Sequence, residues 1–260
     1  SKLEESVADY LGISESEHSR LYRNNGDGTF SNVTKEVKLD AVLLSMGANY
    51  GDIYNDGFLD AYIGTGQPAM NSLVPIRMFR NSGGSVFQDV TTSGGFGHLQ
   101  KGHGISYGDI DNVGDQDIYA VLGGAYSGDT YQNALFRNPG SRNHWITLRL
   151  VGDKSNRTAV GARIRVTTVT EAGNRDIYVT LGTGGSFGGS SLQQEIGLGQ
   201  AKSIETIEIR WPNRAKSVQL VKDVPMDRTV EVREGVTEHR LIPLTKIDFP
   251  SQGAHQGHQH

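Results

Sequence analysis

Two short acidic segments, separated by 57 residues, constrain this chain more than any other feature. The segments "GDIYNDGFLD" (51–60) and "GDIDNVGDQD" (108–117) each lie between two apolar stretches. Similarity at a fixed period of this length is typical of proteins built from repeated β units, such as the blades of a propeller. The four carboxylates in 109–117 also repel one another unless a positive charge lies among them. The pattern therefore predicts a repeated fold that binds a cation.

A second element recurs around these segments, at 21–34, 78–91 and 135–148. Each copy has an aromatic residue followed by Arg-Asn, and each reads as a strand, an Asn/Gly turn and a second strand. Each repeat unit would then supply about four short strands, as a propeller blade does. The 34 glycines and the scarcity of helical runs indicate an all-β protein. One helix is expected within 2–12, where apolar residues recur at helical spacing.

The acidic segments have the ligand spacing of a compact calcium loop. Such a loop places oxygen ligands at positions 1, 3 and 5, a main-chain carbonyl at 7 and a carboxylate at 9, with a glycine at the bend. In the second segment the ligands would be Asp109, Asp111, the carbonyl of Asp115, and Asp117. In the first they would be Asp52, Asp56, the carbonyl of Phe58, and Asp60. The alternative is an acidic, solvated turn that binds no metal.

These loops and the sequence that follows them resemble two known families. The Asp-x-Asp-x-Asp-Gly-x-x-Asp pattern is similar to FG-GAP (VCBS) repeats, the calcium-binding blades of integrin-type β-propellers. Downstream, "NHWITLRLVGDKSNRTAVGARIRV", "GGSFGGSSLQQEIGLG" and "IETIEIRWPN" resemble the ASPIC and UnbV domain. Together the resemblances cover nearly 20–235. They imply a partial β-propeller that binds Ca²⁺, in a protein found outside the cell, at the cell surface or in the periplasm.

Each loop departs from the family pattern at one ligand position. Tyr54 stands at position 3 of the first loop, and Val113 stands at position 5 of the second. Each loop thus lacks one side-chain oxygen, so we expect weak binding, with dissociation constants of roughly 0.1 to 1 mM. The second loop keeps the pair Asp109 and Asp111, and we expect it to bind calcium more tightly than the first.

The chain divides into four regions. Residues 1–20 are expected to form a helical capping segment and 21–143 the propeller blades. From 144 to 236 apolar and polar residues alternate, which predicts a small β-sandwich of half-buried antiparallel strands with Trp211 in its core. Residues 237–260 are expected to form a tail. It ends in His255, His258 and His260, and whether they bind a metal is open.

Composition excludes several classes of function. The net charge of −4, with 25 basic and 29 acidic residues interspersed, provides no basic stripe for nucleic acid. No run of about 18 apolar residues predicts a membrane span, and the absence of cysteine excludes disulfides and thiolate chemistry. His98, Lys101 and His103 precede the second loop, but no nucleophile accompanies them. We therefore expect no enzyme.

The sequence predicts a non-enzymatic, extracellular calcium-binding propeller that acts in adhesion or binding, with a protein or a carbohydrate at the cell surface as partner. One alternative is a structural subunit of a larger surface complex or filament. Another is an accessory domain of a secreted enzyme. A closed propeller needs about four blades or more, whereas two acidic units and a lone hairpin at 21–34 are found. Blades upstream of Ser1, or another chain, are therefore expected to pack beside 21–62.

Overall fold

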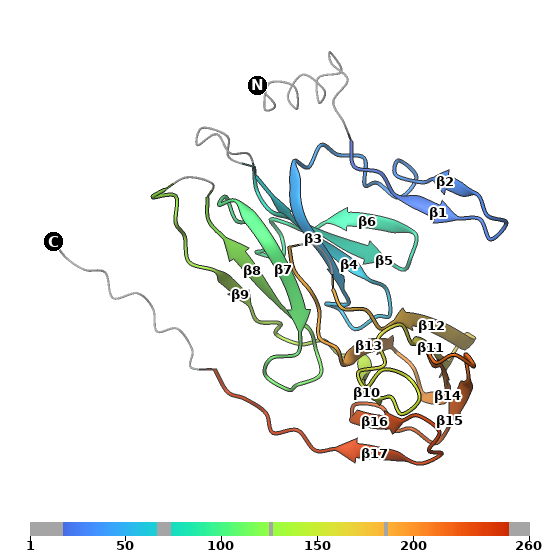
Figure 1. Ribbon diagram of the computed structural model, residues 1–260. Coiled ribbons are helices and arrows are strands. Elements are labelled where there is room, and N and C mark those ends of the chain that lie inside the picture. The colour runs from blue at the N-terminus through green and yellow to red at the C-terminus, as the bar shows by residue number, and fades with distance from the viewer. Residues whose placement is uncertain (1–17, 67–73, 125–126, 185–186, 250–260) are drawn as a thin grey trace.

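The computed structural model describes residues 18–66, 74–124, 127–184 and 187–249 (Figure 1). This part of the chain contains strands and no helix, which confirms the all-β prediction. It therefore holds no helix of the length and apolarity needed to cross a membrane. The helix expected within 2–12 and the three terminal histidines lie outside the described residues. The strands are β1 (Tyr22–Asn24), β2 (Phe30–Asn32), β3 (Ser45–Gly51), β4 (Asp60–Thr65), β5 (Arg77–Ser82), β6 (Val86–Asp89), β7 (Gly102–Gly108), β8 (Asp117–Leu122), β9 (Ala134–Phe136), β10 (His144–Val151), β11 (Arg163–Thr170), β12 (Gly173–Thr180), β13 (Gln194–Gly199), β14 (Ser203–Arg210), β15 (Val218–Val221), β16 (Thr229–Arg233) and β17 (His239–Ile242).

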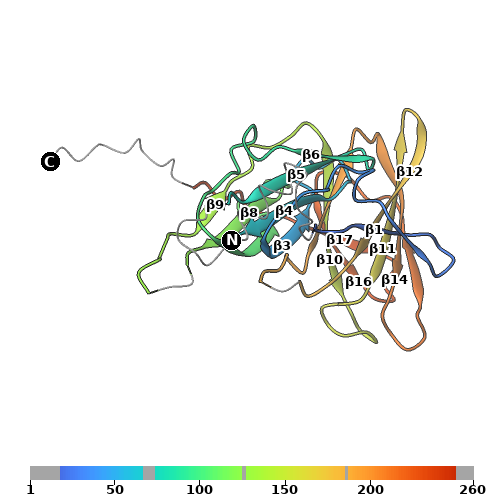
Figure 2. The same cartoon turned by 90° about the horizontal axis from the view of Figure 1, so that it is seen from above.

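The repeat half is a partial β-propeller, as predicted. Strands β3 to β6 form a four-stranded antiparallel sheet in sequence order, β7 to β9 form a three-stranded sheet, and β1 and β2 form a separate hairpin. The two larger sheets lie face to face (Figures 1 and 2). Their shared core is apolar, because alternate residues of each strand face the neighbouring blade. It is formed by Ile53, Tyr62, Ile76, Met78, Ile105, Tyr107, Ile118, Ala120 and Leu122.

Glycines on β3 allow these two blades to approach closely. A Cβ atom on Gly47 would lie 1.8 Å from the carbonyl oxygen of His103, and one on Gly51 would lie 2.1 Å from the ring of Tyr107. Both distances are far below van der Waals contact. The first strand of one blade therefore contacts the first strand of the next through its backbone, and this contact brings the two acidic loops together.

The third copy of the recurring element is not the hairpin that the sequence predicts. Residues 134–136 form β9, which pairs with β8. The second half of the copy begins β10, and this strand pairs with β13 and β16 instead. Residues 144–151 do not alternate regularly, since 146, 147 and 148 are all buried, so their pattern does not identify the partner strands. The second blade thus has three strands within the described residues, and not the four or so that its repeat unit predicts.

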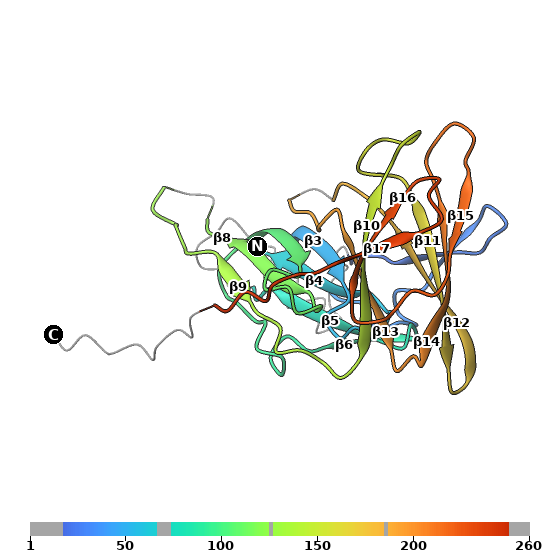
Figure 3. The same ribbon diagram turned by 90° about the horizontal axis from the view of Figure 1, so that it is seen from below.

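The C-terminal half is a β-sandwich, as predicted. One sheet has the order β13-β10-β16-β17 and the other the order β12-β11-β14-β15 (Figures 2 and 3). Trp211 is buried between them, as expected, in a core that includes Ile146, Leu148, Ile164, Ile207 and Val230. The sequence predicts antiparallel strands, but β10 and β16 run parallel.

The expected boundary at 236 falls one strand too early. Strand β17 (239–242) pairs with β16 and so belongs to the sandwich. Its four residues carry too little alternation to reveal a strand in the sequence. The chain then turns back toward the repeat half (Figures 1 and 3).

Candidate metal centre

The two acidic loops have the same position and the same backbone conformation. Each connects the first two strands of its sheet, β3 to β4 and β7 to β8. The first aspartate of each loop accepts two backbone N–H groups across the turn. Asp52 accepts those of residues 56 (3.0 Å) and 57 (2.7 Å), and Asp109 accepts those of residues 113 (3.0 Å) and 114 (2.9 Å). The 57-residue repeat is therefore a repeat of hydrogen bonds as well as of sequence.

The last aspartate of each loop attaches it to the following hairpin. Asp60 accepts the N–H of Ile53 at 3.0 Å and that of Asn81 at 2.8 Å. Asp117 makes the matching bonds, at 3.1 Å to residue 110 and 2.7 Å to Asn138. The asparagines are those of the recurring aromatic-Arg-Asn element, so its function within the fold is to close each loop.

The second loop brings three of its predicted ligands together. Carboxylate oxygens of Asp109, Asp111 and Asp117 all lie within 4.8 Å of one another, the one such group of His, Asp or Glu among the described residues. The side chains of Asp111 and Asp117 are 4% and 2% exposed. Burial raises the pKa of Asp109 and of Asp117. The cluster is thus a buried, like-charged set of oxygen atoms.

One oxygen of this cluster has no partner in the protein. Oδ1 of Asp111 is buried and makes no hydrogen bond. A buried carboxylate oxygen without a donor is costly, and three converging carboxylates suit a hard cation such as calcium. The fourth predicted ligand is the main-chain carbonyl of Asp115. The carboxyl group of this residue is not part of the converging set. Burial first, and then the charges of Asp117 and Asp111, raise the pKa of Asp115 to about 7.

The first loop does not gather its three carboxylates in this way. Asp52, Asp56 and Asp60 do not form a converging group within the described chain. Tyr54 occupies the position that corresponds to Asp111, and its ring lies 4.0 Å beneath the guanidinium of Arg80. Burial raises the pKa of Asp52 to about 7 and that of Asp60 to about 8.

Arginine side chains supply positive charge around the first loop. Arg80 approaches the carboxylate of Asp56 at 3.9 Å. Arg175, from β12 of the sandwich, donates to the carbonyl oxygen of Asp56 at 2.8 Å and lies 4.3 Å over the ring of Phe58. Part of the charge that a metal ion would provide is therefore already present in the protein.

The two loops are joined by side chains that no pattern in the sequence predicts. Oε1 of Gln116 accepts the N–H of Asp52 at 2.7 Å, and its Nε2 donates to Glu195 of β13 at 2.9 Å. Asn55 donates to the carbonyl of Gly114 at 3.0 Å. Burial raises the pKa of Glu195. Gln116 stands inside the acidic segment, but no signal in the sequence identifies Glu195 as its partner 79 positions later.

The segment after β17 also contacts the second loop. Ile247 donates its N–H to the carbonyl of Asp111 at 2.9 Å, and Asn112 donates to the carbonyl of Thr245 at 3.0 Å. Residues 243–249, expected to be part of a tail, therefore cover one side of the candidate metal centre.

The residues that could have suggested catalysis make separate contacts. Lys101 is paired with Asp129 at 2.6 Å. His98 accepts the N–H of Gln100 at 3.1 Å, and Nε2 of His103 lies 2.9 Å from the carbonyl of Gly123. The His98 contact lies within one loop, whereas those of Lys101 and His103 join the start of β7 to the segment after β8.

The fold and the loops define a class of protein: a partial propeller with acidic inter-strand loops, followed by a β-sandwich. Comparison with family models shows the two parts separately. Residues 7–63 match the FG-GAP-like repeat, and residues 152–239 match the ASPIC and UnbV family. The chain therefore combines an FG-GAP-like repeat with an ASPIC and UnbV domain, as the sequence resemblance implied. Comparison with curated proteins gave no match.

Proposed function

We propose that this protein is a calcium-stabilised, non-enzymatic binding protein that acts outside the cell or at its surface. Asp109, Asp111 and Asp117 would hold the ion, together with the carbonyl of Asp115. One observation carries the proposal: Oδ1 of Asp111 is buried among carboxylates and has no hydrogen-bond donor. The first loop would bind calcium more weakly, because Tyr54 replaces a ligand and Arg80 already lies near Asp56.

The location follows from the expected affinity. A loop that lacks one charged ligand belongs with the weak sites of extracellular modules, whose dissociation constants are on the order of 0.1 to 1 mM. Such a site fills at extracellular calcium concentrations and stays empty in cytosol. In this proposal His98, Lys101 and His103 have no catalytic role, and each makes a separate contact.

The first prediction tests the metal with Asp111→Asn. Asp109 and Asp117 also accept backbone N–H groups, so replacing either one removes structural hydrogen bonds. Asp111 offers a cleaner substitution, because its Oδ1 has no donor to lose. With 5 mM calcium, mass action should stabilise the wild-type protein by about 1 to 2 kcal/mol relative to EDTA. For a chain of this size that raises the Tm by roughly 2 to 8 °C.

Asp111→Asn should abolish this shift and should raise the Tm in EDTA, because a buried negative charge is removed from a like-charged cluster. Glu171→Gln serves as the control, since that exposed carboxylate pairs with Lys202 in the sandwich and should leave the shift intact. A wild-type Tm that is the same in EDTA and in calcium would overturn the proposed metal site.

A second candidate function, a structural subunit of a larger surface assembly, is favoured by the β1–β2 hairpin. All six of its strand residues are exposed, including Tyr22 (51%) and Phe30 (63%). Strands rarely leave both faces of a hairpin uncovered. If a further blade or a second chain packs here, the protein should associate with rising concentration, and Phe30→Ser should weaken that association. Light scattering that gives a monomer at every concentration would exclude association between copies.

A further inference from the structure

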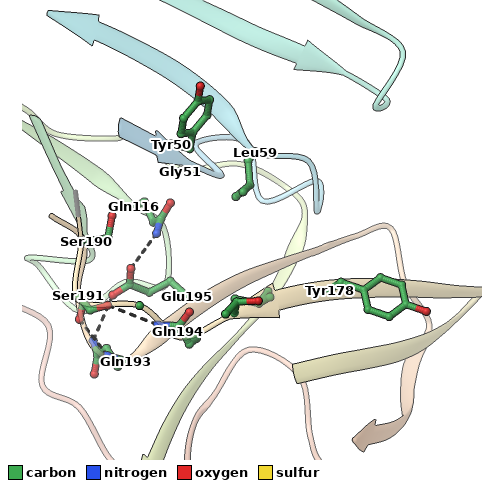
Figure 4. A pocket seen from close by; sticks show the side chains of 14 residues that line it. Tyr50, Gly51, Leu59, Gln116, Tyr178, Ser190, Ser191, Gln193, Gln194 and Glu195 are labelled. Atoms are coloured by element: carbon green, nitrogen blue, oxygen red, sulfur yellow. Dashed lines mark hydrogen bonds between the residues drawn. The ribbon is translucent and has the colours of Figure 1, made fainter. Parts of the chain in front are cut away.

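A cleft of about 500 Å³ lies where the first acidic loop meets the sandwich (Figure 4). Tyr50 and Leu59 line it on the propeller side, and Gln116 comes from the second loop. The sandwich side is lined by β12 and the turn after it (178–180, 182 and 184) and by the segment leading into β13 (190, 191 and 193–195). In Figure 4 the side chains of Gln116, Ser191, Gln193 and Glu195 gather at one end, and Tyr50 and Leu59 lie across the opening. Four separate parts of the chain therefore form this site.

The polar groups of the cleft are mostly neutral. They are carboxamides and hydroxyls, and Glu195 is the one charged side chain among the described lining residues. That carboxylate already accepts hydrogen bonds from Gln116 at 2.9 Å and Gln193 at 3.3 Å. No Lys, Arg or His lines the cleft within the described residues, so nothing there would offset the charge of an anionic ligand. A neutral ligand rich in hydroxyl groups fits this set of donors and acceptors.

The opposite side offers apolar surface. Tyr50 is 50% exposed and Leu59 is 55% exposed. The Tyr50 hydroxyl makes no hydrogen bond within the described residues, so it remains available to a ligand. An exposed tyrosine ring with an available hydroxyl can contact the C–H face of a sugar and bond its hydroxyl groups at the same time.

We propose that this cleft binds a short neutral saccharide, with Tyr50 and Leu59 contacting its apolar face and Gln193 and Ser190 bonding its hydroxyl groups. The proposal rests on the proposed binding function and names its ligand class. The volume of the cleft lies within the range of small-molecule sites. Such sites usually combine an apolar wall with a few convergent polar groups, as this cleft does.

The test uses the full chain in 2 mM calcium chloride. Isothermal titration calorimetry with neutral oligosaccharides of glucose, xylose, mannose and N-acetylglucosamine should detect binding of at least one series. Tyr50→Ala and Gln193→Ala should each weaken that binding at least tenfold. Tyr119→Ala and Gln88→Ala are the matched controls, because these residues are exposed on other strands, β8 and β6, and should leave the affinity unchanged.

Binding that is lost in both cleft variants and kept in both controls supports the proposal. Absence of binding by every neutral series overturns it, and so does binding that the cleft variants do not change. Preference for uronic or sulfated oligosaccharides would also overturn the assignment to a neutral ligand. Because the calcium-dependent Tm is measured separately, a protein that binds calcium but no sugar would refute the saccharide site alone.

Discussion

At the scale of single residues, two buried carboxylates differ in how many hydrogen-bond donors surround them. Glu234 of the sandwich accepts three successive backbone N–H groups, those of Asp153 at 2.8 Å, Lys154 at 2.9 Å and Ser155 at 2.7 Å. Asn213 donates to its other oxygen. Asp111 has no such donors for its buried Oδ1. The protein's own donors stabilise the charge of Glu234, whereas under the proposed function an ion from solution would stabilise that of Asp111.

Glu234 should therefore make the stability of the sandwich depend on pH. Burial alone would raise its pKa, but the hydrogen bonds from Ser155, Asn213 and Asp153 outweigh it and lower the pKa to about 2. A carboxylate with a lowered pKa in the folded state stabilises the protein above its unfolded pKa of 4.5 and loses that contribution as the pH falls toward 2. Glu234→Gln should lower the free energy of unfolding by about 2 kcal/mol at pH 7.

Urea unfolding at pH 7, 4 and 2.5 measures the difference between wild type and Glu234→Gln. That difference should shrink as the pH falls below 4.5, because Glu234 of the unfolded chain takes up a proton while the folded side chain stays largely ionised. A constant difference across this range would show that the charge of Glu234 contributes nothing. Glu238→Gln, a substitution of an exposed residue in the same region, should show no dependence of this kind.

At the scale of elements, the two loops form a matched pair for comparing structure with metal binding. Asp60 and Asp117 accept equivalent pairs of N–H groups. Alanine at either position should therefore destabilise the protein in EDTA by a similar amount, about 2 kcal/mol or more. Calcium should still raise the Tm of Asp60→Ala, whereas Asp117→Ala should lose most of the shift. Equal losses, or a larger loss in Asp60→Ala, would contradict the ranking of the loops.

The sequence reveals these elements where the interactions are local. The hydrogen bonds within 52–60 and 109–117 join residues at most eight positions apart, so their spacing appears directly in the sequence. Arg175 reaches Asp56 across 119 positions, and Glu195 reaches Gln116 across 79. These contacts depend on how the sandwich docks against the propeller, which no local pattern encodes. For the same reason the parallel pairing of β10 with β16 could not be predicted.

At the scale of the whole molecule, strand β13 holds the two halves together. Its residue Gly199 donates to the carbonyl of Asn55 at 2.8 Å, and Glu195 lies near the N–H of Asp109. Gly197 lies against the first loop so closely that a Cβ atom there would be 2.2 Å from Oδ2 of Asp52 and 2.4 Å from Cα of Asn55. The sandwich therefore contacts both acidic loops along one strand.

Gly197→Ala should separate the two halves without unfolding the sandwich. The added methyl group has no space, and the atoms that it meets belong to the backbone of Asn55 and to a buried carboxylate, so the junction must open. Calorimetry of the wild-type protein in calcium should show a single cooperative transition. In Gly197→Ala the propeller transition should move to lower temperature and separate from that of the sandwich, whose core lies on the other side of β13. Gly182→Ala is the control, because its nearest neighbour would be 3.9 Å away. If Gly197→Ala still melts in one transition at the wild-type temperature, β13 does not couple the two halves.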